Sequence, residues 1–294
     1  MPGFRVKGIH HTGVNVSDFE RSLAFYRDAL GFTVLWDLQF GGQRLSTITG
    51  LEKPHTRAAL LDAGNQHIEL FCYDAPPSVN HVARPCDVAI THMAIIVPDL
   101  QKTYAELSAQ GTQFNCPPQL VKGTPEEPNY ATYGKAPEGI VLEMMQVPGF
   151  GSQIHHNALN VTDFERSLSF YRDALGLVVR WDRDQSGEML SRITGLEDPH
   201  ARQALLSVGD QHIELFQYHS PTPVNHVARP CDVAITHIGL LVDDIQAAYA
   251  ELSAKGMQFN CPPQLVRGGP QDGLQATYGH DPDGIILELM QEPS

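Results

Sequence analysis

The alternation of apolar and polar residues near the start of the chain predicts a β-strand over residues 8–16. Successive side chains of a strand point to opposite faces of its sheet, so a period of two indicates a strand with one buried face. Val14 and Val16 fall on one face of this strand, whereas His11 and Asn15 fall on the other. We expect the apolar face to pack against the core.

A helix is predicted directly after this strand. Ser17 and Glu20 have the spacing of a capping box at its start. Gly31 stands where a helix commonly ends in a left-handed conformation. The apolar positions between these ends repeat at the spacing of one buried helical stripe, formed by Phe19, Leu23, Tyr26 and Leu30. Three further strands are then expected, over residues 32–38, 57–63 and 66–73.

The next part of the chain repeats this plan with a different sequence. Asp99 is the expected N-cap of a second helix, and Gly111 is expected to close it. Strands are expected on either side of this helix, over residues 90–97, 113–116, 130–134 and 139–146. The pattern therefore predicts a β-α-β-β-β module that occurs twice in the first half of the chain.

A gapless internal repeat then doubles the arrangement, with the offset that separates His11 from His156. About two thirds of the positions from 9 to 148 are identical to their counterparts, and the segment Pro-Gly-Phe-Gly at 148–151 joins the copies. We therefore expect an α+β protein with four modules in two domains. The first domain would cover residues 1–149, with modules at 8–73 and 88–147, and the second would cover residues 150–294, with modules at 153–218 and 233–292.

The two copies differ mainly in two stretches, 38–47 against 183–192 and 122–138 against 267–283. One interpretation is drift in surface loops. The other is that the two copies have pockets of different shape. The sequence leaves both interpretations open.

Composition narrows the class of protein. Hydrophobic residues make up 42% of the chain, which is enough for a substantial core, and the formal net charge is −14. Because so acidic a chain is repelled by phosphates and anionic lipids, we expect a small-molecule substrate and neither nucleic-acid nor membrane partners. The sequence has no apolar run of membrane-spanning length, its start lacks the apolar stretch of a secretory leader, and five cysteines imply no disulfide framework. We expect a cytoplasmic protein that is a monomer or a homodimer.

Polar residues interrupt apolar strands at matching places in each module. His11 opens the first strand of module one and Glu69 lies in its last strand, and His92 and Glu143 take the same places in module two. Burying an unpaired carboxylate costs several kcal/mol, so each glutamate is expected to have a partner. Two imidazoles and two carboxylates suit a divalent metal ion such as Fe²⁺, Ni²⁺, Zn²⁺, Mn²⁺ or Co²⁺. The counterparts in the second copy are His156, Glu214, His237 and Glu288.

The sequence resembles the vicinal oxygen chelate superfamily, which includes glyoxalase I, methylmalonyl-CoA epimerase, extradiol dioxygenases and bleomycin-binding proteins. The resemblance rests on His11 and on the segments 19–32, 67–70, 91–92 and 281–288. It implies curved mixed sheets around a metal-site cavity in each domain. It also implies that eight residues are metal ligands, namely His11, Glu69, His92, Glu143, His156, Glu214, His237 and Glu288.

The resemblance leaves two ways to pair the modules. If modules pair within a copy, His11 and Glu69 share a site with the ligands of module two. If they pair across the copies, His11 and Glu69 instead meet His237 and Glu288. We favour pairing within a copy, because the join between the copies is short and each copy would then fold locally.

Coordination number separates the candidate reactions. A ring-cleaving dioxygenase holds Fe²⁺ with two histidines and one carboxylate and leaves three positions open. A glyoxalase-like or epimerase-like enzyme adds a fourth protein ligand and uses a glutamate as general base. The fourth ligand is present in both copies, as Glu69 and Glu214. This favours lyase or isomerase chemistry, with a dioxygenase as the first alternative and a non-catalytic binding protein as the second.

The expected catalytic residues are Glu69, Glu143, Glu214, Glu288, His212 and Tyr278. His212 shares a strand face with Glu214 and is a candidate base, although a histidine that supports a ligand, or one at the surface, is its more ordinary interpretation. Tyr278 lies ten residues before Glu288, as in the extradiol dioxygenase fingerprint, but the upstream histidine of that fingerprint is missing. Three pairs of basic residues are candidates to bind a substrate carboxylate, namely Arg57/Arg202, Arg84/Arg229 and Lys122/Arg267.

Overall fold

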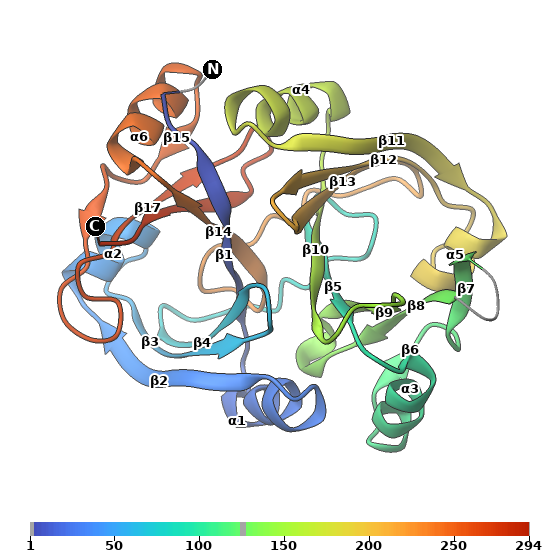
Figure 1. Ribbon diagram of the computed structural model, residues 1–294. Helices are drawn as coiled ribbons and strands as arrows, with labels where there is room; N and C mark the ends of the chain where they lie inside the picture. The colour runs from blue at the N-terminus through green and yellow to red at the C-terminus, as the bar shows by residue number, and fades with distance from the viewer. Residues whose placement is uncertain (1–2, 124–127, 294) are drawn as a thin grey trace.

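The computed structural model describes residues 3–123 and 128–293 and shows four successive units, each with a strand, a helix and further strands (Figure 1). The first unit contains β1 (Val6–Asn15), α1 (Phe19–Ala24), a π-helical turn (Phe25–Ala29), β2 (Thr33–Gly41), α2 (Gln43–Thr49), β3 (His55–Asp62) and β4 (His67–Ala75). The second contains β5 (Ala89–Ile96), α3 (Leu100–Ala109), β6 (Gln113–Phe114), β7 (Gln119–Gly123), β8 (Pro128–Lys135), a 3-10 turn (Pro137–Gly139) and β9 (Val141–Gln146).

The second copy repeats these elements. Its first unit contains β10 (Gln153–Asn160), α4 (Phe164–Ser169), a π-helical turn (Phe170–Ala174), β11 (Val178–Ser186), α5 (Glu188–Thr194), β12 (His200–Val208) and β13 (Gln211–Ser220). Its last unit contains β14 (Ala234–Val242), α6 (Ile245–Ala254), β15 (Gln258–Phe259), β16 (Gln264–Leu265), β17 (Gln275–His280) and β18 (Ile286–Gln291). The α+β class and the repeated module are confirmed.

The helix ends follow local chemistry, with one correction to the sequence prediction. Asp18, and not Ser17, caps α1: its carboxylate accepts a hydrogen bond from the backbone N–H of Arg21 at 3.1 Å. The Ser17 hydroxyl instead donates to Glu138, which lies in the second module. Ser17 therefore helps to dock one module on another.

Two short helices escaped the sequence prediction. Helix α2 and its counterpart α5 each lie between two glycines, and Gly42 and Gly50 have φ values of 90° and 73°. The strand β7 was also missed. Part of the divergent stretch 122–138, residues 124–127, lies outside the described residues.

Two nine-stranded sheets form, and each combines modules from both copies. The first has the order β15-β17-β18-β14-β1-β4-β3-β2, with β16 beside β17. The second has the order β11-β12-β13-β10-β5-β9-β8-β6, with β7 beside β8. In Figure 1 the blue and red ends of the chain accordingly share one half of the molecule, and the green and gold segments share the other.

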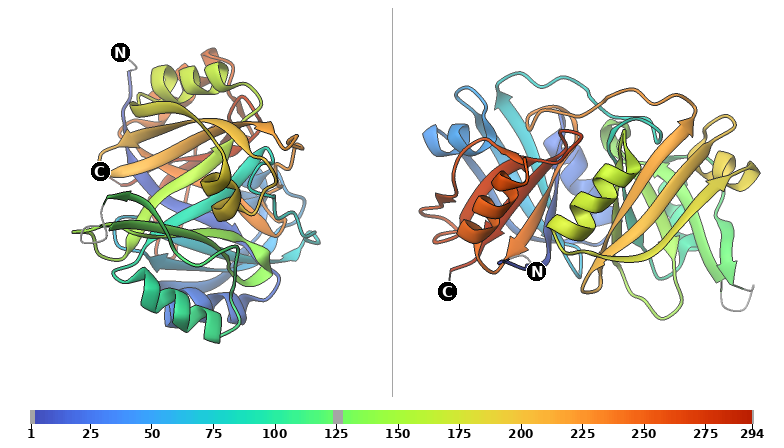
Figure 2. Two further views of the ribbon diagram at one scale, coloured as in Figure 1. Left: turned by 90° about the vertical axis from the view of Figure 1, so that its right-hand side faces the viewer. Right: turned by 90° about the horizontal axis from the view of Figure 1, so that it is seen from above.

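The preference for pairing within a copy is therefore wrong, and the lengths of the connections explain why. The short join after β9 leads into β10, and both strands belong to the second sheet. The connections within each copy, residues 76–88 and 221–233, are the long ones, and they cross from one sheet to the other (Figure 2). A short join keeps the modules that it connects in one sheet, whereas a long connection can span two.

Hydrogen bonds join the two long connections to each other. The buried carboxylate of Asp232 accepts from the backbone N–H of Val79 at 3.2 Å, and Asp87 accepts from Val224 at 3.0 Å. Arg229 and Arg84 pair with these two aspartates at 2.6 Å. The arginines thus balance the charges of the two buried aspartates where the long connections cross between the sheets.

The sheets also contact each other directly. The side-chain amide of Gln211 exchanges two hydrogen bonds with the backbone of Ile9, at 2.6 and 2.8 Å, and Thr12 donates to Asn157 at 2.8 Å. One hydrophobic cluster includes residues of both sheets and of the helices outside them. Within the described residues no helix is long and apolar enough to cross a membrane.

Candidate metal centres

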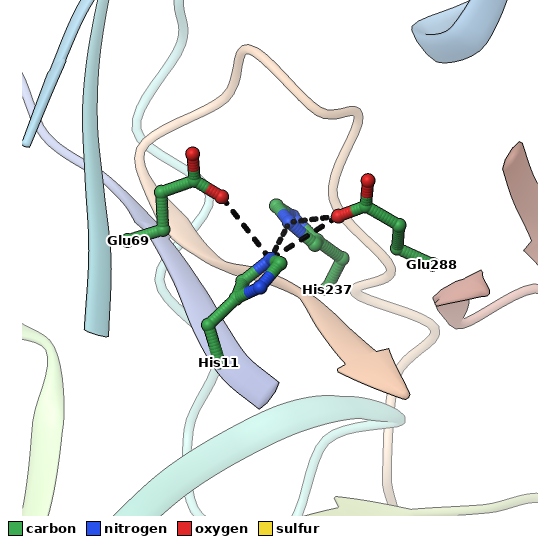
Figure 3. Close-up of side chains that lie close together, drawn as sticks. All are labelled: His11, Glu69, His237 and Glu288. Atoms are coloured by element: carbon green, nitrogen blue, oxygen red, sulfur yellow. Dashed lines mark hydrogen bonds and ion pairs between the residues drawn. The ribbon is translucent and has the colours of Figure 1, made fainter. Parts of the chain in front are cut away.

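Four side chains converge in the first sheet to form site A, which consists of His11, Glu69, His237 and Glu288 (Figure 3). His11 on β1 and His237 on β14 lie on adjacent antiparallel strands, with their Nε2 atoms 3.0 Å apart. His11 Nε2 is 3.2 Å from an oxygen of each glutamate, and His237 Nε2 is 3.7 Å from Glu288. One ligand atom from each of the four residues lies within 4.8 Å of the others.

Glycines opposite the histidines make this approach possible. In the pairing of β1 with β14, Gly239 lies opposite His11 and Gly13 lies opposite His237. A Cβ atom on Gly13 would lie 2.0 Å from the ring of His237, and one on Gly239 would lie 2.4 Å from the ring of His11. At site A the two rings therefore lie where a Cβ atom at either glycine would be.

The second sheet contains site B, which consists of His92, Glu143, His156 and Glu214. His156 Nε2 is 3.3 Å from Glu143, 3.0 Å from Glu214 and 3.4 Å from His92 Nε2. Ligand atoms of His92, Glu143 and His156 lie within 4.8 Å of one another.

Site B differs from site A in the residues opposite its histidines. Ala94 and Ala158 stand there in place of the two glycines. With these methyl groups present, the Nε2 atoms of the two site B histidines lie 3.4 Å apart, compared with 3.0 Å at site A.

The residue before each histidine orients its ring. His10 Nδ1 lies 2.9 Å from His11 Nδ1, and Thr236 Oγ1 lies 3.0 Å from His237 Nδ1. The pairs His155–His156 and Thr91–His92 repeat these contacts in site B at 2.8 and 3.3 Å. Because Nδ1 has a partner, Nε2 of each histidine is the nitrogen that faces the site.

The buried charges shift one another's pKa values. Burial raises the pKa of Glu69 to about 7, with His11 opposing the shift and Glu288 adding to it. Burial lowers the pKa of His11, but the carboxylates of Glu69 and Glu288 more than offset this, so its pKa is raised. In site B the pKa of His156 is likewise raised, to about 10, because Glu214 and Glu143 outweigh burial.

The donor set fits a divalent metal ion. Four side chains that are nearly excluded from water present two imidazole nitrogens and two carboxylates to one point. Carboxylates this deeply buried need positive charge, and at site A the nearby donors are histidines that are neutral when they act as ligands. A metal ion of charge two would neutralise both carboxylates of each site.

Tyr278 also belongs to site A. It lies opposite Glu288 in the pairing of β17 with β18, and its hydroxyl is 3.1 Å from His237 Nε2. Tyr133 takes the same place in site B, 3.0 Å from His92 Nε2. Sequence reasoning missed Tyr133, although the repeat offset that relates His92 to His237 also relates Tyr133 to Tyr278.

His212 lies beside site B, where it contacts His155. Its Nδ1 is 3.1 Å from the carbonyl oxygen of His155, and the two rings stack with centroids 5.0 Å apart. Its role as a base stays a prediction. The half-buried position of the ring agrees with its ordinary interpretation as a support for its neighbours.

A cavity of about 340 Å³ opens onto site A. Glu69, Glu288 and Tyr278 line it, together with residues of β2, α2 and the loop before β17. Arg267 lines this cavity, and so does Arg44. The remaining candidate arginines are engaged elsewhere: Arg57 and Arg202 bind surface carboxylates, and Arg84 and Arg229 lie in the crossover.

Comparison with known proteins identifies the family. The profile of the Glyoxalase/Bleomycin resistance protein/Dioxygenase superfamily matches the chain twice, over residues 8–143 and 153–289. The chain belongs to this superfamily. The vicinal oxygen chelate resemblance is thus confirmed, and the two matches fall in the two copies.

Relatives in the superfamily include enzymes. Glyoxalase I from Saccharomyces cerevisiae is 22% identical over 316 residues, which span 96% of this chain and 91% of the yeast protein. The 2-epi-5-epi-valiolone epimerase of an Actinomyces species is 28% identical over 153 residues, which span 50% of this chain and 83% of that protein. The crystal structure of glyoxalase I from Zea mays has the same fold, with a TM-score of 0.68 and 19% identity over 98% of this chain and 92% of the maize chain.

Proposed function

We propose that this protein is a metal-dependent isomerase or lyase whose substrate binds through two adjacent oxygen atoms. The observation that carries the proposal is the convergence of two histidines and two glutamates at site A, within 4.8 Å of one another. Four protein donors leave room for two substrate oxygens around a six-coordinate metal ion, and this is the arrangement expected of proton-transfer chemistry on such a substrate.

The ligands would be His11, Glu69, His237 and Glu288 at site A and His92, Glu143, His156 and Glu214 at site B. The metal would be Fe²⁺, Ni²⁺, Zn²⁺, Mn²⁺ or Co²⁺, and when bound it supplies Lewis acidity, which stabilises negative charge on the substrate oxygens.

The chain's own residues would supply proton transfer. Glu69 and Glu288 line the cavity, so a substrate bound there would lie beside their carboxylates. We propose that these glutamates, with Glu143 and Glu214 at site B, take and return the proton. The hydroxyls of Tyr278 and Tyr133 face the same reacting region and are placed to donate a hydrogen bond.

A ring-cleaving dioxygenase is the second candidate, and one observation at site B favours it. Ligand atoms of His92, Glu143 and His156 form a close group of three, the number of protein donors in a two-histidine, one-carboxylate iron site. Glu214 nevertheless lies 3.0 Å from His156, which favours four donors here as well.

Two measurements test the proposal. Elemental analysis after reconstitution should give about two metal ions per chain, and a value near zero would overturn the metal-dependent function. The substitutions Glu69→Gln and Glu214→Gln then separate the reactions. Loss of a ligand should weaken metal binding and reduce turnover by about 10-fold or more, whereas full oxygen-dependent ring cleavage by the double variant would show a dioxygenase.

A further inference from the structure

The wall beside each metal centre is formed by an outer strand of its sheet, and the two walls differ in chemistry. At site A the strand β2 presents Trp36, Leu38 and Phe40 to the cavity. Leu38 is 41% exposed, which is unusual for a large apolar side chain on a strand next to buried carboxylates. The positions related by the repeat at site B are Trp181, Arg183 and Gln185 on β11.

The strand register places these site B residues on the face that carries the metal ligands. Trp181 pairs with Leu205, and Leu205 pairs with the ligand Glu214. Arg183 lies two residues beyond Trp181, so its side chain points to the same face of the sheet. Arg183 is therefore the site B counterpart of the cavity-lining Leu38.

Arg183 is held in place by its neighbours. Its guanidinium carbon lies 4.3 Å from the centre of the Trp181 ring. With the Gln203 amide turned so that its oxygen faces the guanidinium, this oxygen accepts from Nη2 and Nε of Arg183 at 2.9 and 2.8 Å, and the amide also contacts Gln185. Gln203 is only 2% exposed, and the corresponding residue at site A is Ala58. A buried amide thus supports the guanidinium in one copy, where the other copy has a methyl group.

We propose that the two metal centres take different substrates, and that the outer strands β2 and β11 make the difference. This rests on the proposed function, because both substrates would bind through two adjacent oxygens. Site A takes a substrate with an apolar body, which packs on Trp36, Leu38 and Phe40. Site B takes a substrate with a carboxylate or a similar anionic group, which Arg183 binds through two parallel hydrogen bonds.

Two arginines also line the cavity of site A. Arg44 and Arg267 are exposed there, and site B has Met189 and Lys122 at the related positions. Arg183 is exposed as well, but the ring of Trp181 and the buried amide of Gln203 hold its guanidinium in one position.

The test uses full-length chains with one working centre, loaded with Zn²⁺. His92→Ala leaves site A, and His11→Ala leaves site B. The probes are benzohydroxamate and 4-carboxybenzohydroxamate, which chelate a metal through adjacent oxygens and differ only in one carboxylate. The ratio of their dissociation constants, measured by calorimetry, should differ at least about 10-fold between the two proteins, with the carboxylated probe favoured at site B.

Exchanging these residues between the two sites then tests whether they cause the difference in the ratio. In the His11→Ala background, Arg183→Leu with Gln203→Ala should shift the ratio toward that of site A. In the His92→Ala background, Leu38→Arg with Ala58→Gln should shift the ratio the other way. Bound zinc in each variant shows that its centre is intact, and Arg183→Leu alone serves if the double change does not fold. Failure of both probes to bind either zinc-loaded protein would overturn the proposed function, whereas equal ratios at the two sites would overturn only the difference in substrates.

Discussion

The Nε2 atoms of His11 and His237 lie 3.0 Å apart although 226 residues separate them in the sequence. Each belongs to a different copy of the repeat, so site A is shared between the copies, and site B is shared in the same way. The duplication thus did not produce two independent clusters. In each candidate metal centre, two of the four side chains come from each copy.

Double substitutions should reveal this sharing. His11→Ala and Glu288→Ala remove ligands of one centre, so the variant that combines them should retain about one metal ion per chain. His11→Ala with His92→Ala removes a ligand from each centre, so that variant should retain none. Metal content after reconstitution measures both outcomes. One retained metal in the second variant would contradict the cross-copy arrangement.

The sequence predicted the modules well because their signals are local. Periodicity located the strands that carry His11 and Glu69, and Asp99 caps α3 as expected, with its carboxylate 2.9 Å from the backbone nitrogen of Lys102. Gly31, with φ of 77°, ends the first helical segment as expected. These features depend on neighbours within a few residues, which a single sequence displays.

Pairing between modules could not be predicted in this way. The first strands of the four modules, β1, β5, β10 and β14, have the same apolar pattern. Periodicity therefore does not indicate which of them pair with each other. The Gly13–His237 and Gly239–His11 contacts lie between β1 and β14, and they relate residues more than two hundred positions apart. The one available signal was the exchange of Gly13 and Gly239 for Ala158 and Ala94 between the copies.

Those glycines give a second prediction. In Gly13→Ala and Gly239→Ala the new Cβ atom meets the ring of a ligand histidine, so the ring must move away from the other donors. We expect metal affinity at site A to fall by about 10- to 100-fold, as when a residue supporting a ligand is lost. Titration of the His92→Ala protein with Zn²⁺ measures this.

The chain offers a matched control in site B. Ala158→Gly and Ala94→Gly open the same space around His92 and His156 without adding an atom. These variants should keep metal affinity at site B or increase it. An equal loss at both sites would show that the effect is a general weakening of the strands and not a displacement of the histidines.

Metal uptake should release protons. Glu214 and Glu143 raise the pKa of His156 to about 10, so at pH 8 the metal-free site holds a proton on this imidazole. A histidine binds a metal only when its nitrogen is free. In the His11→Ala protein, affinity for Zn²⁺ should therefore rise about tenfold per pH unit below pH 10. Calorimetry at pH 8 in buffers of different ionisation enthalpy measures the released proton, and heats that do not depend on the buffer would contradict this account.

A buried aspartate outside both centres should govern part of the pH dependence of folding. The carboxylate of Asp281 accepts from the Tyr171 hydroxyl at 2.8 Å and from the backbone N–H groups of Asp283 and Ile285 at 2.8 and 2.9 Å. Burial raises its pKa from 3.8 to about 6, and these hydrogen bonds offset only part of the shift. Ala136 stands at the related position in the first copy, so only the second copy carries this buried acid.

Because the folded-state pKa of Asp281 lies above the ordinary value of 3.8, the fold favours the protonated acid. Its contribution to stability is fully present below pH 3.8 and is lost as the pH rises through 6, by up to about 3 kcal/mol.

The substitution Asp281→Asn removes this titratable carboxyl group. From pH 4 to pH 7 the free energy of unfolding of the parent protein, measured in urea, should therefore fall relative to that of the variant. Asp210→Asn, the same substitution at an exposed position, is the matched control. A parent protein that instead gains stability relative to Asp281→Asn over this range would show that the three hydrogen bonds outweigh burial.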